Sequence, residues 1–277
     1  MLPGLFKRLG RKCPRLQRLS LQMANLLLVP MARLPRTLRR LEMHSCDLSM
    51  SWMARKEDEG ALPHLEQLVL DRVPTFEDFH LLRLRCFPAL RSLVLAGTYR
   101  LTDAGLDRGL RVLSHLQRIE VLGCLISADS ALQAISCHLL EVRHIRVTLE
   151  GLSDSGLASL EGIPTLENFG LLATTNTREV VTLATKLLSS CLTLPRLRVL
   201  ELQGKRGVWH KAEMILKKGL AHCQVIVSAA PHKTMDWWRL DRNPQYARKC
   251  RRDSLSSSMG TGERQRVMVR FSFCLGQ

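Results

Sequence analysis

Apolar residues recur along the chain in one short pattern, Leu-x-x-Leu-x-Leu, whose last two apolar positions alternate with polar ones. Clear copies begin two residues after a proline, at Leu16, Leu65, Leu90 and Leu197, and weaker copies begin at positions 38, 116, 142 and 166. From position 16 to position 197 there are seven intervals, so the mean spacing is about 26 residues. A fixed period of this size predicts a solenoid of stacked repeats.

Each repeat is predicted to hold one strand and one helix. The alternating residues indicate a strand with one buried face, and an amphipathic stretch follows it. Thr102, Ser127 and Ser153 are the expected N-caps of three helices, and further helices are expected over residues 76–87 and 212–223. Strand–helix–strand units give a parallel sheet through right-handed crossovers. The motif therefore predicts an α/β leucine-rich-repeat solenoid of about eight repeats. It would be a horseshoe of the ribonuclease-inhibitor type, with a concave sheet and convex helices.

The same alternation predicts which residues line the concave face. It places an exposed apolar patch around Val69, Val94, Ala96 and Leu122. Contiguous exposed apolar surface often marks a binding site for another protein, so we expect a protein partner there. Four arginines on this face would suit a phosphate group if they form one cluster, namely Arg18, Arg40, Arg118 and Arg146. The candidate substrate-binding residues are Arg18, Arg40, Glu42, His44, Gln67, Val69, Asp71, Val94, Arg118, Glu120, Leu122, His144, Arg146 and Glu201.

The net charge of +16 is concentrated at the two ends. Residues 1–40 hold ten basic residues and no acid, residues 239–277 have a net charge of +6, and residues 41–238 are therefore neutral. A nucleic-acid reader carries a basic stripe over its binding face, so we do not expect nucleic acid as the partner. The alternative, association through the basic ends, predicts affinity that falls steeply with salt.

Candidate chemistry is sparse. Nine cysteines without a C-x-x-C pair predict reduced structural thiols, no metal site and no cofactor. His44 and Cys46 are a conceivable nucleophile pair, but a repeat-position cysteine beside a surface histidine is the preferred interpretation, and we expect no enzyme. The longest apolar run, residues 26–32, is too short to span a membrane. Since no signal peptide is visible, a cytoplasmic or nuclear location is expected.

Several segments resemble one group of repeat proteins in their turns and helices as well as in the leucine frame. They include LRRLEMHSCDLSMSWM, LRSLVLAGTYRLTDAGLDRGL, LQRIEVLGCLISADSALQAIS and MDWW. From Leu5 to Trp238 the chain resembles the F-box and leucine-rich-repeat family. The resemblance implies substrate recognition in a Skp–cullin–F-box ubiquitin ligase, which directs targets to proteasomal degradation. The alternative is a ligase-independent scaffold or inhibitor that masks a protein partner.

The expected domains are a repeat domain, residues 1–238, and a basic tail, residues 239–277. The opening MLPGLFKRLGRKCPRL already has the pattern of a helix preceding a repeat, so we expect no F-box in this chain. A Skp-type adaptor and cullin would then bind only a full-length form that has one. The tail is rich in Arg, Ser and Gly and is expected to be disordered through Gly262, while alternation over residues 266–275 predicts one strand. Residues 174–186 fit the family poorly, and the 31-residue interval there predicts a longer loop or helix.

Overall fold

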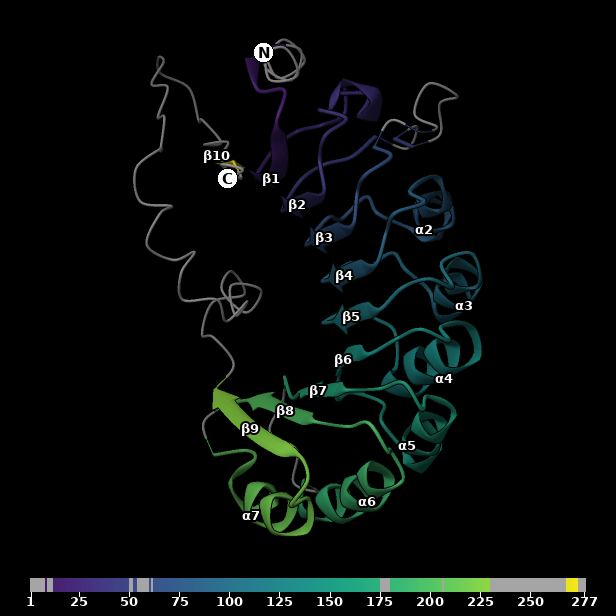
Figure 1. The fold of residues 1–277 in the computed structure, drawn as a ribbon, viewed down its shortest axis with the longest axis vertical. Coiled ribbons are helices and arrows are strands. Elements are labelled where there is room, and N and C mark those ends of the chain that lie inside the picture. The colour runs from purple at the N-terminus through teal and green to yellow at the C-terminus, as the bar shows by residue number, and fades with distance from the viewer. Residues whose placement is uncertain are drawn as a thin grey trace.

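The computed structural model describes residues 8, 12–49, 52–53, 60, 62–174, 180–205, 207–229 and 268–273. Its strands line the inside of a curved solenoid and its helices line the outside (Figure 1). The sheet follows the order β10-β1-β2-β3-β4-β5-β6-β7-β8-β9. The predicted leucine-rich-repeat solenoid, with its parallel sheet and flanking helices, is therefore confirmed.

Nine strands run parallel and in register, and a tenth runs antiparallel to the first. Eight of the nine begin within the eight predicted motifs. The ninth was missed: the helix predicted over 212–223 ends earlier, and QVIVSA then forms one more strand. The strands are β1 (Leu16–Gln22), β2 (Arg40–His44), β3 (Gln67–Asp71), β4 (Ser92–Ala96), β5 (Arg118–Leu122), β6 (His144–Thr148), β7 (Asn168–Leu172), β8 (Val199–Gly204), β9 (Gln224–Ala229) and β10 (Met268–Phe273).

The convex side carries one helix in most repeats. The predicted N-caps are confirmed, because Thr102, Ser127 and Ser153 each accept a backbone N–H with their side-chain oxygen. Between β1 and β2 the helix is replaced by one 3₁₀ turn, in the shortest interval between motifs. The helical elements are η1 (Met31–Arg33), α2 (Asp78–Arg83), η3 (Leu84–Cys86), α3 (Asp103–Arg111), α4 (Ala128–His138), α5 (Asp154–Ser159), η4 (Leu160–Gly162), α6 (Val180–Leu192) and α7 (His210–Gly219).

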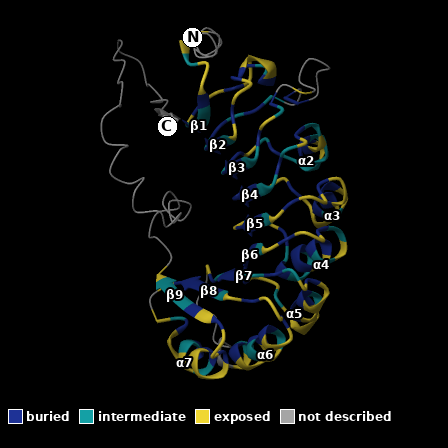
Figure 2. Cartoon of the chain, in the orientation of Figure 1, coloured by how far each residue is buried: buried dark blue, intermediate teal, exposed yellow. Residues whose placement is uncertain are grey.

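The core fills the space between the sheet and the helices, where buried residues line the inner side of each helix (Figure 2). Leu68 and Leu93 are at most 1% exposed. Glycines let neighbouring helices approach closely: a Cβ on Gly105 would lie 1.9 Å from the Asp78 carboxylate, and one on Gly109 would lie 2.4 Å from Cγ of Leu81. These two positions of α3 therefore accept no larger residue without a shift of α2.

Aspartates in the first turns join successive helices. Asp78 accepts hydrogen bonds from the Thr102 backbone N–H at 2.9 Å and from its hydroxyl at 2.7 Å. Asp129 accepts the Ser153 backbone N–H at 2.8 Å, and Asp103 accepts the N–H of Ser127 at 3.4 Å. Each aspartate thus fixes the N-cap residue of the next repeat, which in turn caps its own helix. This cap ladder connects α2, α3, α4 and α5.

The predicted tail lies mostly outside the described residues. Residues 230–267 and 274–277 are not described, so the boundary at 238 and the disorder expected through Gly262 stay predictions. β10 falls within residues 266–275, where alternation predicts a strand, and it adds to the sheet at β1. The 31-residue interval between the motifs at 166 and 197, for which a longer loop or helix is predicted, contains helix α6. Among the described helices, none is long and apolar enough to cross a bilayer.

Candidate functional site

The concave face consists of three columns of side chains that run across the strands. The strands pair in register, so the residues predicted to line the concave face lie in columns across neighbouring strands. Their exposure differs from the prediction. The first column, which includes Arg40, Gln67, Arg118 and His144, is partly exposed, whereas most of the other two columns is buried. Parallel strands are about 4.8 Å apart, and concave curvature brings side-chain ends closer still, so neighbours in a column cover one another.

The predicted exposed apolar patch is wrong in one respect. Val69, Val94, Ala96 and Leu122 do gather on the concave face, but each is only 3–6% exposed. They form a second apolar cluster, separate from the main core, against which Leu172 packs. We call these five residues the concave apolar strip. It is the packed centre of the face and presents little free apolar area.

On one side of the strip lies a first polar network, built on β2 and β3. Arg40 Nε donates to Glu42 at 2.5 Å, and its Nη1 donates to Gln67 Oε1 at 3.1 Å. His44 Nδ1 lies 3.2 Å from the Asp71 carboxylate, and its Nε2 lies 3.6 Å from that of Glu42. Two carboxylates therefore flank a single imidazole on this buried surface.

These contacts shift two pKa values in opposite directions. Burial alone would lower the pKa of His44, but the hydrogen bond with Asp71 and the nearby carboxylate of Glu42 outweigh it, so the pKa is raised above 6.5. Burial alone would raise the pKa of Glu42, yet the neighbouring His44 imidazole and the charge and hydrogen bond of Arg40 lower it below 4.5. Both shifts favour the charged forms, so the network stabilises an ion pair.

The second polar network is built on β5, β6 and β8, beside Leu122 and Leu172 of the strip, and centres on Glu120. This carboxylate is 1% exposed and accepts from Arg118 Nη2 at 2.5 Å and from its Nε at 2.9 Å. Arg146 Nη1 and His144 Nε2 lie 3.5 and 3.6 Å from it. Burial would raise its pKa, but His144, Arg118 and Arg146 together lower it to about 2.

Arg146 reaches over a whole strand to complete this second network. Its Nη2 donates to Glu201 on β8 at 2.7 Å, although β7 lies between the two strands. The β7 residue in register is Gly170, on which a Cβ would lie 2.8 Å from Arg146 Cγ. A larger residue there would displace the arginine. The leucine frame marks Gly170 as a concave residue, but only the three-dimensional contact shows why it is glycine.

The four concave arginines do not form one phosphate-binding cluster. Arg40 belongs to the first polar network, and Arg118 and Arg146 belong to the second, with Val69 and Val94 of the apolar strip between them. Each of these three guanidinium groups already pairs with a carboxylate of the same face. Sequence reasoning also missed Arg72, which follows β3 and lies 3.3 Å from Asp71, because its place after the strand does not mark it as concave.

His44 and Cys46 are not arranged as a nucleophile and its base. The Cys46 thiol is fully buried and lies 3.6 Å from the Leu21 carbonyl and 3.5 Å from that of His44. Burial raises its pKa to about 11, so the thiol is protonated at neutral pH. Cys46 fills the repeat position predicted for it, but His44, which was expected at the surface, is only 4% exposed because Asp71 and Glu42 pack against it. In the part of the chain that the structure describes, no group of three or more His, Cys, Asp or Glu residues is arranged to hold a metal ion.

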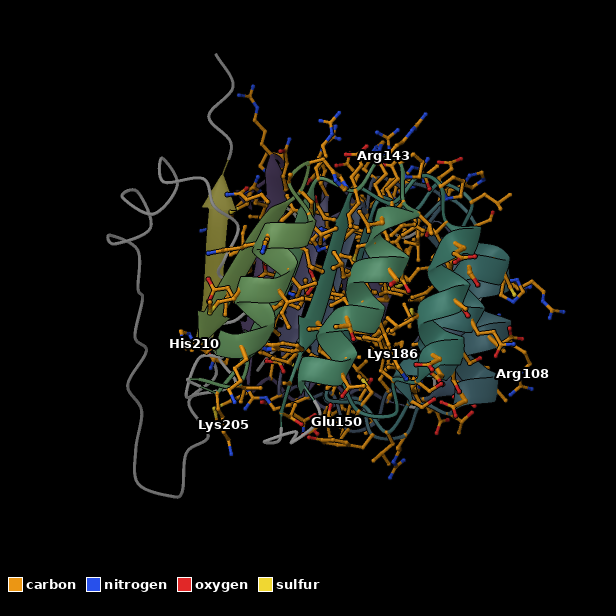
Figure 3. All side chains as sticks on the ribbon, turned by 90° about the horizontal axis from the view of Figure 1, so that it is seen from below. Arg108, Arg143, Glu150, Lys186, Lys205 and His210 are labelled. Carbon is orange, nitrogen blue, oxygen red and sulfur yellow. The ribbon has the colours of Figure 1, made fainter. Side chains whose placement is uncertain are left out.

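Charged side chains elsewhere on the solenoid also form ion pairs. Arg143, which precedes β6, lies on the opposite lateral edge from Glu150 and Lys205 (Figure 3). Arg143 pairs with Glu167 at 3.2 Å, and Lys186 on the helical side pairs with Asp154 at 2.7 Å.

Known proteins from three organisms are similar to most of this chain. F-box/LRR-repeat protein 12 of Homo sapiens is 58% identical over 236 residues, which cover 85% of this chain and 72% of that protein. The Bos taurus and Mus musculus proteins of the same name are 57% and 56% identical over the same shares. The crystal structure of a TLR13–ssRNA13 complex aligns with a TM-score of 0.39 and 16% identity, over 79% of this chain and 34% of that one. No family model matches.

Proposed function

Because this chain belongs to the F-box/LRR-repeat proteins, we propose that it is the substrate-binding repeat domain of a Skp–cullin–F-box ubiquitin ligase. The concave face binds a target protein, and an F-box in the full-length form joins the repeats to a Skp-type adaptor and a cullin. Held in this way, a target lysine has a high effective concentration near the ubiquitin-conjugating enzyme. The repeats themselves supply binding, and their target is passed on for proteasomal degradation.

The observation that carries the proposal is that the side chains of the concave face are held in place by one another. Two polar networks flank the concave apolar strip, and their charged groups are fixed by contacts with one another. Binding costs less entropy when side chains are already held in place. A preformed pattern of charge beside an apolar centre favours one partner over others, since mismatched charges are left without partners.

The partner is expected to touch the partly exposed first column before anything else. Ser92 and Asn168 lie in this column, on opposite sides of the second polar network, and both are half-buried. Arginine at both positions would fill the concave face with two long charged side chains. Gln133 and Met214 lie on the convex helices α4 and α7 and are exposed, so arginine there makes a matched control.

Proximity labelling in cells tests the binding face. The variant with Ser92→Arg and Asn168→Arg is expected to lose at least tenfold of the labelling of its specific partners, while the variant with Gln133→Arg and Met214→Arg keeps it. Equal loss in both variants, or in neither, would contradict concave-face binding. Circular dichroism melts must show that both variants fold.

The link to a ligase has its own test. Partners found by labelling should gain ubiquitin and turn over faster when the repeats are fused to an F-box, and this effect should vanish with the concave variant. Stable partners under the fusion would instead favour a masking scaffold. We place this activity in the cytoplasm or nucleus, and the free state of the described cysteines supports a reducing compartment.

A further inference from the structure

The outer edge of β1 is backed by the hydrophobic core. β1 spans Leu16–Gln22, and Leu16, Leu19 and Leu21 are at most 1% exposed. An edge strand of this length is a template for pairing with another chain, and natural proteins protect such edges. β1 is also the first of nine parallel strands, so its outer edge could pair with another parallel strand in the same geometry that joins each later strand to the one before it.

The other end of the sheet offers the complementary edge. In the sheet order, β9 is the last strand at the end away from β1, and Figure 1 places the two at opposite ends of the arc. β9 pairs with β8 in the same parallel register as every earlier pair. An open β1 would therefore accept the β9 of a second copy head to tail. Such a contact is heterologous and need not close, so it gives open-ended oligomers.

β10 occupies the edge of β1 in the opposite direction. It is antiparallel, whereas every other strand pairing of the described residues is parallel. The register pairs Val269 with Leu21 and Phe271 with Leu19, and it pairs Arg270 with Ser20 of the concave face. The alternation of the tail therefore matches that of β1. An antiparallel strand leaves an outer edge that does not continue the parallel repeat.

The connection between the ends permits this pairing within one chain. Residues 230–267 join β9 to β10, and 38 residues can extend to about 130 Å. Tethering also gives the strand an effective concentration on the order of mM. Pairing within the chain then outcompetes a second molecule at ordinary protein concentrations.

We propose that β10 is a guard strand: it occupies the edge of β1 within the same chain and prevents that edge from pairing with the β9 edge of a second copy. The proposal is independent of the ligase role, because it concerns how copies of this chain meet one another and not which target the concave face binds.

A disulfide test shows whether the strand sits there in cis. Ser20 and Arg270 are register partners, and opposite residues of an antiparallel pair have Cα atoms about 4.5–5.5 Å apart, which suits a disulfide. The full chain with Ser20→Cys and Arg270→Cys is expected to form an intramolecular 20–270 link, detected by peptide mass spectrometry. Ser20→Cys with Val269→Cys is the control, because adjacent strand residues point to opposite faces. No link, an intermolecular link, or equal linking in both variants would overturn the proposal.

Self-association tests what the strand does. Arg270→Pro removes a backbone donor in the middle of β10 and should weaken its pairing. Light scattering at increasing concentration is expected to show open-ended oligomers for Arg270→Pro, at least tenfold below the concentration at which wild type associates. Ser257→Pro lies outside the described residues and before β10, and it should behave as wild type does. Gln22 and Met268 are also register partners, so loss of a 22–268 link between Gln22→Cys and Met268→Cys reports that Arg270→Pro has freed the edge of β1. An Arg270→Pro chain that has lost this link and is still monomeric would show that β1 needs no guard and would refute the proposal.

Discussion

Replacing Glu120 by glutamine tests whether the buried carboxylate stabilises the sheet. The substitution keeps the shape of the side chain and removes its charge, so Arg118 and Arg146 lose their common partner. Removing one partner of a buried ion pair costs about 3–5 kcal/mol. The pKa of Glu120 gives a second estimate of how much the charged carboxylate stabilises the fold. A value of about 2 in place of 4.5 corresponds to about 3 kcal/mol of stability, since one pKa unit is about 1.4 kcal/mol.

The lowered pKa also predicts how the stability contribution of Glu120 changes with pH. The pKa of Glu120 is lowered in the folded state, so its contribution is fully present above pH 4.5 and is lost as the pH falls toward 2. Urea unfolding followed by circular dichroism should therefore find Glu120→Gln about 3 kcal/mol less stable than wild type at pH 7, with a smaller difference at pH 2.5. Glu66→Gln breaks the half-exposed pair with Arg39 and should cost about 0–1 kcal/mol.

Two results would refute this reasoning. If Glu120→Gln costs no more stability than Glu66→Gln at pH 7, the buried network adds no more than a surface pair. Alternatively, the difference between wild type and Glu120→Gln stays constant from pH 5 to pH 2.5, in which case the carboxylate is not the titrating group. Comparing the two variants removes the effect of other carboxylates, which titrate in both.

Gly109→Ala should lower the free energy of unfolding by about 1–3 kcal/mol, because its Cβ would lie 2.4 Å from a leucine of α2. Chemical denaturation measures this loss. Gly162→Ala is the control, because its Cβ would lie 3.4 Å from the nearest atom. His44→Gln should cost more stability at pH 5.5 than at pH 9, because a raised pKa makes the stabilising charge present below pH 6.5 and absent above the folded-state pKa. Thermal melts at the two pH values measure this difference, and an equal cost at both would contradict it.

The Leu-x-x-Leu-x-Leu motif predicts the sheet well because the alternation of apolar and polar residues is a local property of each strand. A side chain that must face the core of a strand is apolar at every second position, and the repeat supplies this signal eight times. Register follows at once, so the column that holds Glu42, Val69, Val94 and Glu120 is known from the sequence. β9 was missed since it lacks the leading leucine and proline of the other motifs.

Burial on the concave face is not a local property. Whether Val94 is exposed depends on the curvature of the array and on the residues beside it in neighbouring strands, which are about 25 positions away. The same holds for Arg146, whose partner Glu201 is 55 residues distant and is reached only across Gly170. Sequence reasoning identified Arg146 and Glu201 as concave residues but had no means of pairing them.

The cap ladder sets where a repeat of this protein can be cut. Asp78 belongs to one repeat by the leucine frame, and Thr102, which it fixes, belongs to the next. A graft that begins and ends at the strands would separate such a pair at each junction and leave an aspartate and a helix N-terminus without partners. A graft should instead run from one helix to its equivalent and carry the strand between them whole. The unit for building longer or shorter arrays is therefore shifted by half a repeat from the unit that the leucines display.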